Sequence, residues 1–192
     1  PERTSTQIRE NSIIYNVDFE NGQKTGFFLD QRFNRREVAF LSKGKRVLDC
    51  CTHTGSFALN AAMGGAEKVT AMDISNDALT TAKENAFING FEKKIEFVQA
   101  DVFDYLPQVE SLKPAPYDFI ILDPPAFTKS RKTALDAVRG YTEINSRAMK
   151  ALPRGGYLAT CSCSHFTEEK MFVKMLKNAS EYAGVSLRLI KA

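Results

Sequence analysis

The sequence predicts an α/β fold with a doubly wound, mostly parallel sheet, and two features carry this prediction. Short strand-like runs alternate repeatedly with helix-like runs, which is typical of a parallel sheet covered by helices on both faces. The strand-like runs are continuously apolar, "FIIL" at 119–122 above all, as expected of strands buried on both sides. The expected strands are 45–51, 68–74, 94–100, 117–122, 156–162 and 185–191, and the expected helices are 30–41, 56–63, 76–88, 101–112, 141–152 and 167–183.

Residues 12–29 predict a β-hairpin ahead of this alternating region. "SIIYNVDF" alternates apolar and polar residues, Asn21-Gly22 is a strong turn signal, and "GFFL" is the expected returning strand. Ser75 is the expected N-cap of the helix 76–88.

Composition excludes several classes of protein. A chain of 192 residues is large enough for one domain with a substantial core, and it has no apolar run of about 18 residues that would span a membrane. Four cysteines do not suggest a disulfide framework, so we expect a reducing, cytoplasmic setting. The net charge of +3 is too small to indicate a nucleic-acid partner by itself.

Aspartates stand at the ends of the first three predicted strands, where open parallel sheets bind their ligands. These are Asp49, Asp73 and Asp101, and the turn after Asp49 holds a single glycine, Gly55, where a dinucleotide fingerprint needs three. Taken alone, the turn after Asp49 could occur without a ligand, and Asp73 and Asp101 could each cap the next helix. Three in succession favour a nucleoside pocket, with Asp73 accepting hydrogen bonds from the ribose hydroxyls.

The fourth and fifth predicted strands lead into residues that suggest catalysis. Asp123 is followed by Pro124 and Pro125, which cannot continue a strand and therefore fix a stiff loop. Cys161 and Cys163 lie too close together for a redox pair and have no second pair for a metal, so no metal is expected. We interpret Cys161 as a packed strand residue and Cys163, beside a helix start that favours a thiolate, as a nucleophile.

Several motifs resemble those of class I S-adenosylmethionine-dependent methyltransferases, which have a Rossmann-like sheet. "VLDCCTHTGSF", "AMDIS" and "QADVFD" are similar to the superfamily's cofactor motifs. More narrowly, "GQKTGFFLDQR", "DPPAF", "RGYTEIN" and "TCSCSHF" resemble the bacterial 23S ribosomal RNA cytosine-5 methyltransferases. The resemblance implies an N-terminal hairpin extension at 1–30 and a methyltransferase core at 31–192, without the family's PUA domain and with its C-terminal strand missing.

The resemblance also implies roles for individual residues. The hairpin and "LDQR" would belong to the cofactor site rather than to a separate domain. Cys163 and Asp123 would be catalytic, with the thiolate adding to C6 of cytosine and the acid stabilising charge near N3. The cofactor, S-adenosyl-L-methionine, would contact Gln31, Arg32, Asp49, Thr54, Gly55, Asp73, Asp101, Val102 and Asp123. The substrate, ribosomal RNA, would contact Pro124, Pro125, Phe127, Lys129 and Arg131.

Three other functions remain open at this point. A methyltransferase acting on a nitrogen of guanine or adenine would have a similar "DPP" loop but would need no cysteine. A methyltransferase-like module that binds RNA without turnover, and an enzyme acting on a small molecule, are the others. The run "TKSRK" at 128–132 fits phosphate contact and a solvated loop equally well. The oligomeric state and the base that completes the reaction are not predicted.

Overall fold

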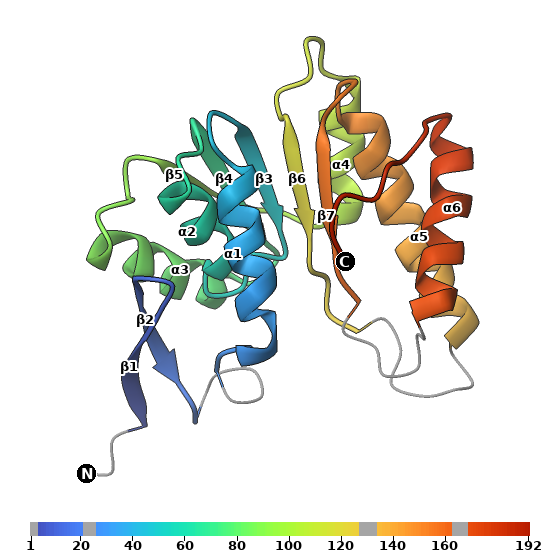
Figure 1. Ribbon diagram of the computed structural model, residues 1–192. Coiled ribbons are helices and arrows are strands. Elements are labelled where there is room, and N and C mark those ends of the chain that lie inside the picture. The colour runs from blue at the N-terminus through green and yellow to red at the C-terminus, as the bar shows by residue number, and fades with distance from the viewer. Residues whose placement is uncertain (1–3, 21–25, 127–133, 163–168) are drawn as a thin grey trace. The chain divides into compact units, whose positions relative to one another are not determined.

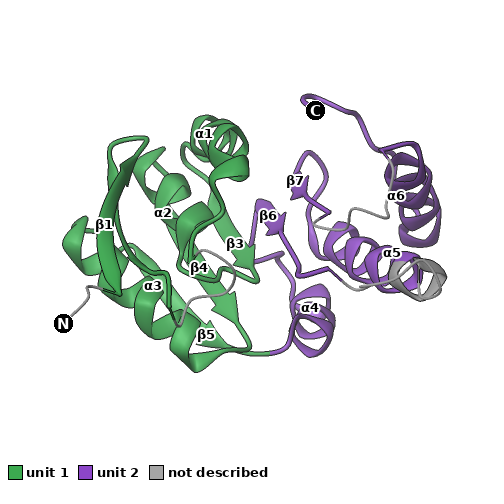
Figure 2. Ribbon diagram, turned by 90° about the horizontal axis from the view of Figure 1, so that it is seen from below, with its two compact units in different colours: residues 1–100 green, residues 101–192 purple. Residues whose placement is uncertain are grey.

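The computed structural model describes residues 4–20, 26–126, 134–162 and 169–192, with the backbone alone at 134–137 (Figure 1). The chain divides into two compact units, residues 1–100 and residues 101–192, which Figure 2 shows in separate colours. Each unit is described by itself below.

The N-terminal hairpin consists of β1 (Ser5–Glu10) and β2 (Ile13–Asp18), paired antiparallel from Ser5↔Asp18 to Glu10↔Ile13. Its turn is Asn11-Ser12, whose φ angles of 49° and 68° are those that a tight two-residue hairpin turn requires. The expected hairpin at 12–29 is therefore placed one strand too late. "SIIYNVDF" does form a strand, but its partner precedes it, and the Asn21-Gly22 turn lies outside the described residues.

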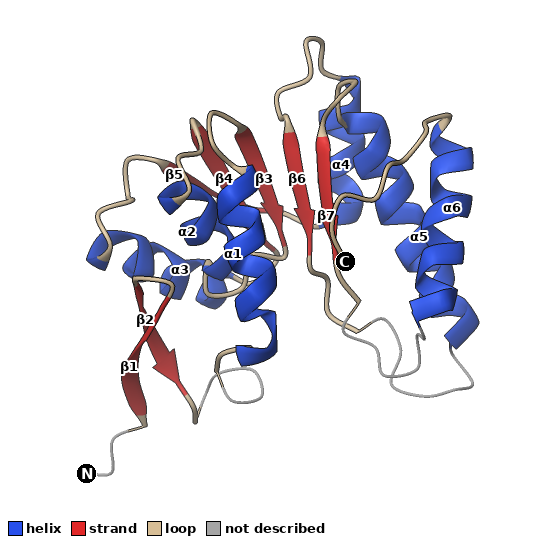
Figure 3. Ribbon diagram, viewed as in Figure 1, coloured by secondary structure: helices blue, strands red, loops and turns tan. Residues whose placement is uncertain are grey.

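Three parallel strands form the sheet of the first unit, in the order β5 (Ile95–Gln99), β4 (Lys68–Asp73), β3 (Arg46–Cys50). The register pairs Cys50 with Met72 and Asp73 with Gln99. Figure 3 shows the three strands side by side. The carboxyl ends of β3 and β4 therefore lie side by side. Asp49 pairs with Ala71, two residues before Asp73, so the two aspartates lie near the same end of the sheet.

Helices of the first unit line one face of these strands, as Figure 2 shows. They are α1 (Arg32–Leu41), α2 (Ser56–Met63) and α3 (Asn76–Ile88), and the 3-10 turn η1 (Leu29–Gln31) leads into α1. The predicted limits of α2 and α3 are confirmed. The Ser75 side chain accepts a hydrogen bond from the Ala78 N–H, which confirms it as the N-cap of α3.

The second unit contains the parallel pair β6 (Phe119–Leu122) and β7 (Tyr157–Thr160) with three helices. These are α4 (Val102–Ser111), α5 (Ala134–Ala151) and α6 (Glu169–Ala183), and α5 packs against both of the others. Tyr141, Met149, Met175 and Ala179 form the buried contact between α5 and α6. Helix α5 begins at Ala134, seven residues earlier than the predicted start at 141.

The expected sixth strand at 185–191 is wrong. The segment Val185–Lys191 has no strand pairing in the part of the chain that the structure describes, although Val185, Leu187 and Leu189 alternate with polar residues. Leu189 is 78% exposed, so the apolar residues of this segment bury little surface in the described structure. Alternation indicates the face that a strand would bury, but a strand forms only where a sheet edge pairs with it. Among the described helices, none is long and apolar enough to cross a membrane.

Candidate cofactor and catalytic site

The turn that joins β3 to α2, residues 51–55, is built around Asp49. Its Oδ2 accepts hydrogen bonds from the Thr52 hydroxyl at 2.6 Å and from the Ala58 N–H at 2.9 Å. Asp49 is fully buried, so it fixes the turn and the first turn of α2 from inside the protein. A carboxylate is favoured at this position because the N–H groups at a helix start carry partial positive charge.

Left-handed backbone conformations shape the same turn. Cys51, His53 and Gly55 have φ angles of 61°, 50° and 80°, and Gly55 is the residue that enters α2. A side-chain carbon at Gly55 would lie 3.1 Å from Cβ of Ala82 on α3. A larger residue would therefore be strained by the positive φ angle and crowded against Ala82. Glycine is therefore required for α2 and α3 to approach each other beside the turn.

Asp73, at the end of β4, contacts the turn from the neighbouring strand. Its Oδ2 accepts the His53 N–H at 2.9 Å, and its Oδ1 accepts the Ser75 N–H at the same distance. Burial lowers the pKa of His53, while the negative charge of Asp73 opposes that shift. The ring of Phe28 contacts His53 edge-on, with 5.5 Å between centroids. Unlike Asp49, which is fully buried, Asp73 is partly exposed.

The hydroxyl of Thr54 indicates whether the groups of this turn fit a cofactor. Its Oγ1 is buried and has no hydrogen-bond partner within the described structure, and buried hydroxyls normally have one. One buried hydroxyl and one partly exposed aspartate, beside a helix start, are groups that bind a nucleoside carrying a charged chain. The donor set thus fits the expected cofactor at Thr54, Gly55 and Asp73.

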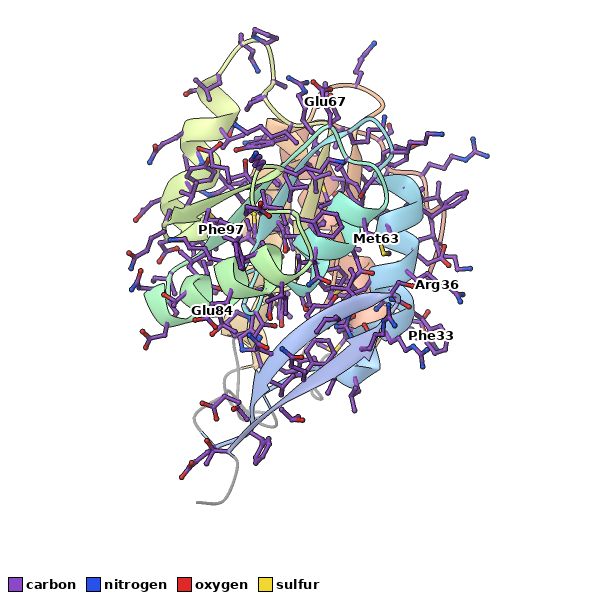
Figure 4. All side chains as sticks on the ribbon, turned by 90° about the vertical axis from the view of Figure 1, so that its left-hand side faces the viewer. Phe33, Arg36, Met63, Glu67, Glu84 and Phe97 are labelled. Atoms are coloured by element: carbon purple, nitrogen blue, oxygen red, sulfur yellow. The ribbon has the colours of Figure 1, made fainter. Side chains whose placement is uncertain are left out.

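Gln31 and Arg32 occupy the junction of η1 and α1. Gln31 is buried, and its Oε1 accepts the Asn34 Nδ2–H at 2.6 Å. Arg32 is exposed on α1, as are Phe33 and Arg36, whose guanidinium lies 5.6 Å from the Phe33 ring centroid (Figure 4). The contacts of Gln31 and Arg32 with a cofactor stay a prediction.

Two anchors of the hairpin escaped the sequence reasoning. Arg35 of α1 and Glu10 of β1 form a buried two-point ion pair at 2.7 and 2.8 Å, with Arg35 stacked 4.6 Å from the centroid of Phe27. Tyr15 of β2 accepts a hydrogen bond from Asn60 of α2 at 2.9 Å, and burial raises the pKa of its hydroxyl. A charged pair at 10 and 35 has no local sequence signal, because the two residues belong to separate elements.

Two amide side chains form hydrogen bonds with the outer edge of β2: Asn85 of α3 and Asn89, the C-cap of that helix. Asn89 accepts the Ile14 N–H at 2.9 Å and donates to the Ile14 carbonyl at 2.6 Å. Asn85 accepts the Asn16 N–H at 2.8 Å and donates to the Thr54 carbonyl at 3.0 Å. These side chains thus satisfy edge groups that a third strand would otherwise pair.

Candidate residues of the second unit stand at its strand ends and at the start of α4. Asp101 caps α4 through the Phe103 N–H at 2.8 Å, and Val102 is buried. The Cys161 N–H donates to the Leu122 carbonyl at 2.8 Å, one step beyond the register pair Leu122↔Thr160. Asp123 and Cys161 therefore follow β6 and β7 side by side.

The other predicted residues of this unit differ in exposure, and some lie outside the described residues. Pro124 is buried and Pro125 is exposed, both directly after Asp123. Cys161 is partly exposed one residue past β7, so the expected placement in the core of the strand is not seen. Cys163, Phe127, Lys129 and Arg131 lie outside the described residues.

An α/β fold with acids at neighbouring strand ends, beside a tight turn into a helix, defines a class of proteins that bind nucleosides and nucleotides. Comparison with known proteins identifies the family within this class. The chain belongs to the S-adenosylmethionine-dependent methyltransferase family, whose model matches residues 2–185. This confirms the predicted cofactor, S-adenosyl-L-methionine.

Curated relatives carry the name ribosomal RNA large subunit methyltransferase I. The protein of Aeromonas salmonicida is 41% identical over 185 residues, which are 96% of this chain and 46% of that protein. The protein of Aeromonas hydrophila is 43% identical over 176 residues, 91% of this chain and 44% of that protein. The chain thus spans about half the length of the curated relatives it matches.

Solved structures agree with the family. The methyltransferase SMU.776, in complex with SAH, matches with a TM-score of 0.82 and 28% identity over 93% of this chain and 47% of that one. A methyltransferase from Streptococcus mutans matches with a TM-score of 0.78 and 29% identity over 94% of this chain and 47% of that one. The likeness confirms the predicted Rossmann-like α/β fold, with parallel strands in each unit and an N-terminal hairpin.

Proposed function

We propose that this chain is the catalytic part of an enzyme that methylates C5 of a cytosine in 23S ribosomal RNA through a covalent adduct on Cys163. The relatives' name supports large-subunit ribosomal RNA as the substrate. The observation that supports the chemistry is the pairing of β6 with β7, because Asp123 and Cys161 follow these two strands at the same end of the sheet.

The reaction needs both groups, because C5 of cytosine is too weak a nucleophile to attack a methyl group unaided. The Cys163 thiolate adds to C6 and converts the ring to an enamine whose C5 is nucleophilic. The Asp123 carboxyl stabilises the charge that develops at N3. When bound, S-adenosylmethionine supplies the methyl group that C5 takes up. A base then removes the C5 proton, and the thiolate leaves C6.

Cofactor residues complete the proposal. Thr54, Gly55 and Asp73 hold S-adenosylmethionine at the turn of the first unit, and Asp101 with Val102 contacts its adenine. Gln31 and Arg32 close over the cofactor, and Asp49 fixes the turn. Pro124, Pro125, Phe127, Lys129 and Arg131 contact the RNA, whose target base leaves its stack to react. A ribosomal RNA substrate and thiol chemistry together favour the cytoplasm as the place of action.

Two measurements test this function. Mass spectrometry of ribosomal RNA from cells with and without the gene should show one methylcytidine lost from 23S rRNA. RNA containing 5-fluorocytidine at the target should trap a covalent adduct, because fluorine at C5 blocks the final elimination.

Substitutions identify the thiol. Cys163→Ser should abolish both adduct and turnover, whereas the matched control Cys161→Ser should retain both. Loss of both in Cys161→Ser alone would move the nucleophile to that partly exposed residue. Methylation by both variants would contradict the adduct and favour transfer to a ring or exocyclic nitrogen.

A further inference from the structure

Asn85 connects two parts of the first unit that are distant in sequence. It is fully buried on α3, and its amide makes one hydrogen bond at each end. The Oδ1 atom accepts the Asn16 N–H of the hairpin at 2.8 Å, and the Nδ2 atom donates to the Thr54 carbonyl of the cofactor turn at 3.0 Å. Its neighbour Glu84 is exposed on the same helix (Figure 4).

The spacing of α3 matches the edge of β2. Four residues of helix rise about 6 Å, and two residues of strand span about 6.6 Å. Asn85 and Asn89 therefore meet Asn16 and Ile14 in turn, two residues apart on the same edge. Asn89 also donates to the Asn85 carbonyl, at 2.7 Å. Both asparagines accept a hydrogen bond from a hairpin N–H, but Asn89 donates back to the Ile14 carbonyl, whereas Asn85 donates to the turn.

We propose that Asn85 is a positioning residue for the cofactor, through which the N-terminal hairpin sets the conformation of the turn at Thr54. The hairpin fixes the amide by occupying its oxygen, so the nitrogen is directed at the Thr54 carbonyl. That bond sets the peptide plane between Thr54 and Gly55, where the left-handed φ of 80° begins. This inference rests on the proposed placement of the cofactor at Thr54, Gly55 and Asp73.

Asn89 provides a matched control that separates two possible roles of Asn85, stabilising the fold and positioning the cofactor turn. Asn85→Asp and Asn89→Asp each keep an oxygen that accepts the hairpin N–H, and each lose the amide donor. In Asn85→Asp the lost donor served the turn, whereas in Asn89→Asp it served Ile14 and the helix. Both variants should lower the thermal unfolding midpoint.

The test measures the affinity for S-adenosylhomocysteine by calorimetry, together with the unfolding midpoint. Asn85→Asp should weaken binding about tenfold, the equivalent of one buried hydrogen bond, while Asn89→Asp stays within about twofold of the wild type. Equal affinities for the two variants would overturn the inference. If Asn85→Asp does not fold, Asn85→Leu and Asn89→Leu, which carry no charge, replace the pair with the same expectation. If neither Asn85 variant folds while both Asn89 variants do, Asn85 acts on stability and the inference also fails.

Asp73→Asn, measured in parallel, separates this failure from a wrong cofactor site. Weak binding by Asp73→Asn with normal binding by Asn85→Asp rejects the role of Asn85 alone. Normal binding by both rejects the placement of the cofactor at this turn. Neither outcome depends on the RNA substrate, so the proposed methylation of cytosine is tested independently.

Discussion

Asp49 and Asp73 end neighbouring strands, and the structure gives them different surroundings. Asp49 is fully buried and accepts hydrogen bonds from the Thr52 hydroxyl and the Ala58 N–H. Asp73 is partly exposed and accepts the N–H groups of His53 and Ser75. We infer that an acid at a strand end either forms the turn or contacts the ligand, and that its burial indicates which of the two roles it has. We therefore expect substitutions of Asp49 to act on stability and those of Asp73 to act on binding.

The largest effect is expected for Asp49→Ala. Loss of the carboxylate leaves two buried donors without their acceptor, which costs about 3 kcal/mol at ~1–3 kcal/mol for each group. Urea unfolding followed by circular dichroism measures the change. Asp49→Asn, which keeps one accepting oxygen, is the control and should lose clearly less. Equal stability of Asp49→Ala and the wild type would contradict the role of Asp49 in building the turn.

Asp73→Asn should weaken cofactor binding, and it should cost about 1 kcal/mol of stability because only one of the His53 and Ser75 N–H groups keeps its acceptor. The amide retains one accepting oxygen but loses the charge that strengthens hydrogen bonds from the ribose hydroxyls, worth about 2 kcal/mol or roughly 30-fold in affinity. Calorimetry with S-adenosylhomocysteine provides the measurement. Unchanged affinity would mean that the ribose does not lie at β4.

Ser75→Ala tests whether the loop after Asp73 is merely a helix start. Loss of the N-cap bond to Ala78 should cost about 1 kcal/mol of stability, because capping serines contribute about that much. Cofactor affinity should not change, since the Ser75 N–H to Asp73 remains. Thermal unfolding and calorimetry on the same sample check both statements. A parallel loss of affinity would assign the hydroxyl to the ligand instead.

The smallest effect concerns pH and His53, which lies between the two acids. Burial lowers the pKa of folded His53, so the unfolded chain binds more protons between the folded pKa and the unfolded value of about 6.5. The contribution of His53 to stability is therefore complete above the unfolded pKa and falls as pH drops through this window. Urea midpoints at pH 5 to 7.5 for the wild type and His53→Gln test this. A slope that is identical in both proteins would assign the pH dependence to other groups.

Local signals allowed much of the fold to be predicted. The limits of α2 and α3 and the cap at Ser75 follow from apolar spacing and capping chemistry, which act within a few residues. The hairpin was misplaced because Asn21-Gly22 is a stronger turn signal than Asn11-Ser12. The pairing of β1 with β2 also depends on groups that anchor the strands from outside the hairpin, such as Arg35, which pairs with Glu10.

The candidate site was predictable only in part, for the same reason. Strand-end positions identified Asp49 and Asp73 but not their different burial, which depends on the packing of α2. Asn85 gave no signal, because its partners Asn16 and Thr54 lie 69 and 31 residues away. Buried amides that link distant elements are found from coordinates rather than from spacing.

Neutral amides bind the outer edge of β2 to α3, and this has a consequence for ionic strength. Salt screens exposed charges strongly, but it has little effect on hydrogen bonds between buried neutral groups. The Glu10–Arg35 pair is also shielded, with side-chain exposures of 5% and 1%. RNA contacts made by lysines and arginines weaken steeply as salt rises. Rising salt should therefore weaken binding of the proposed RNA substrate while the hairpin keeps its contacts with the cofactor turn. Cofactor affinity should then change much less with salt than RNA affinity.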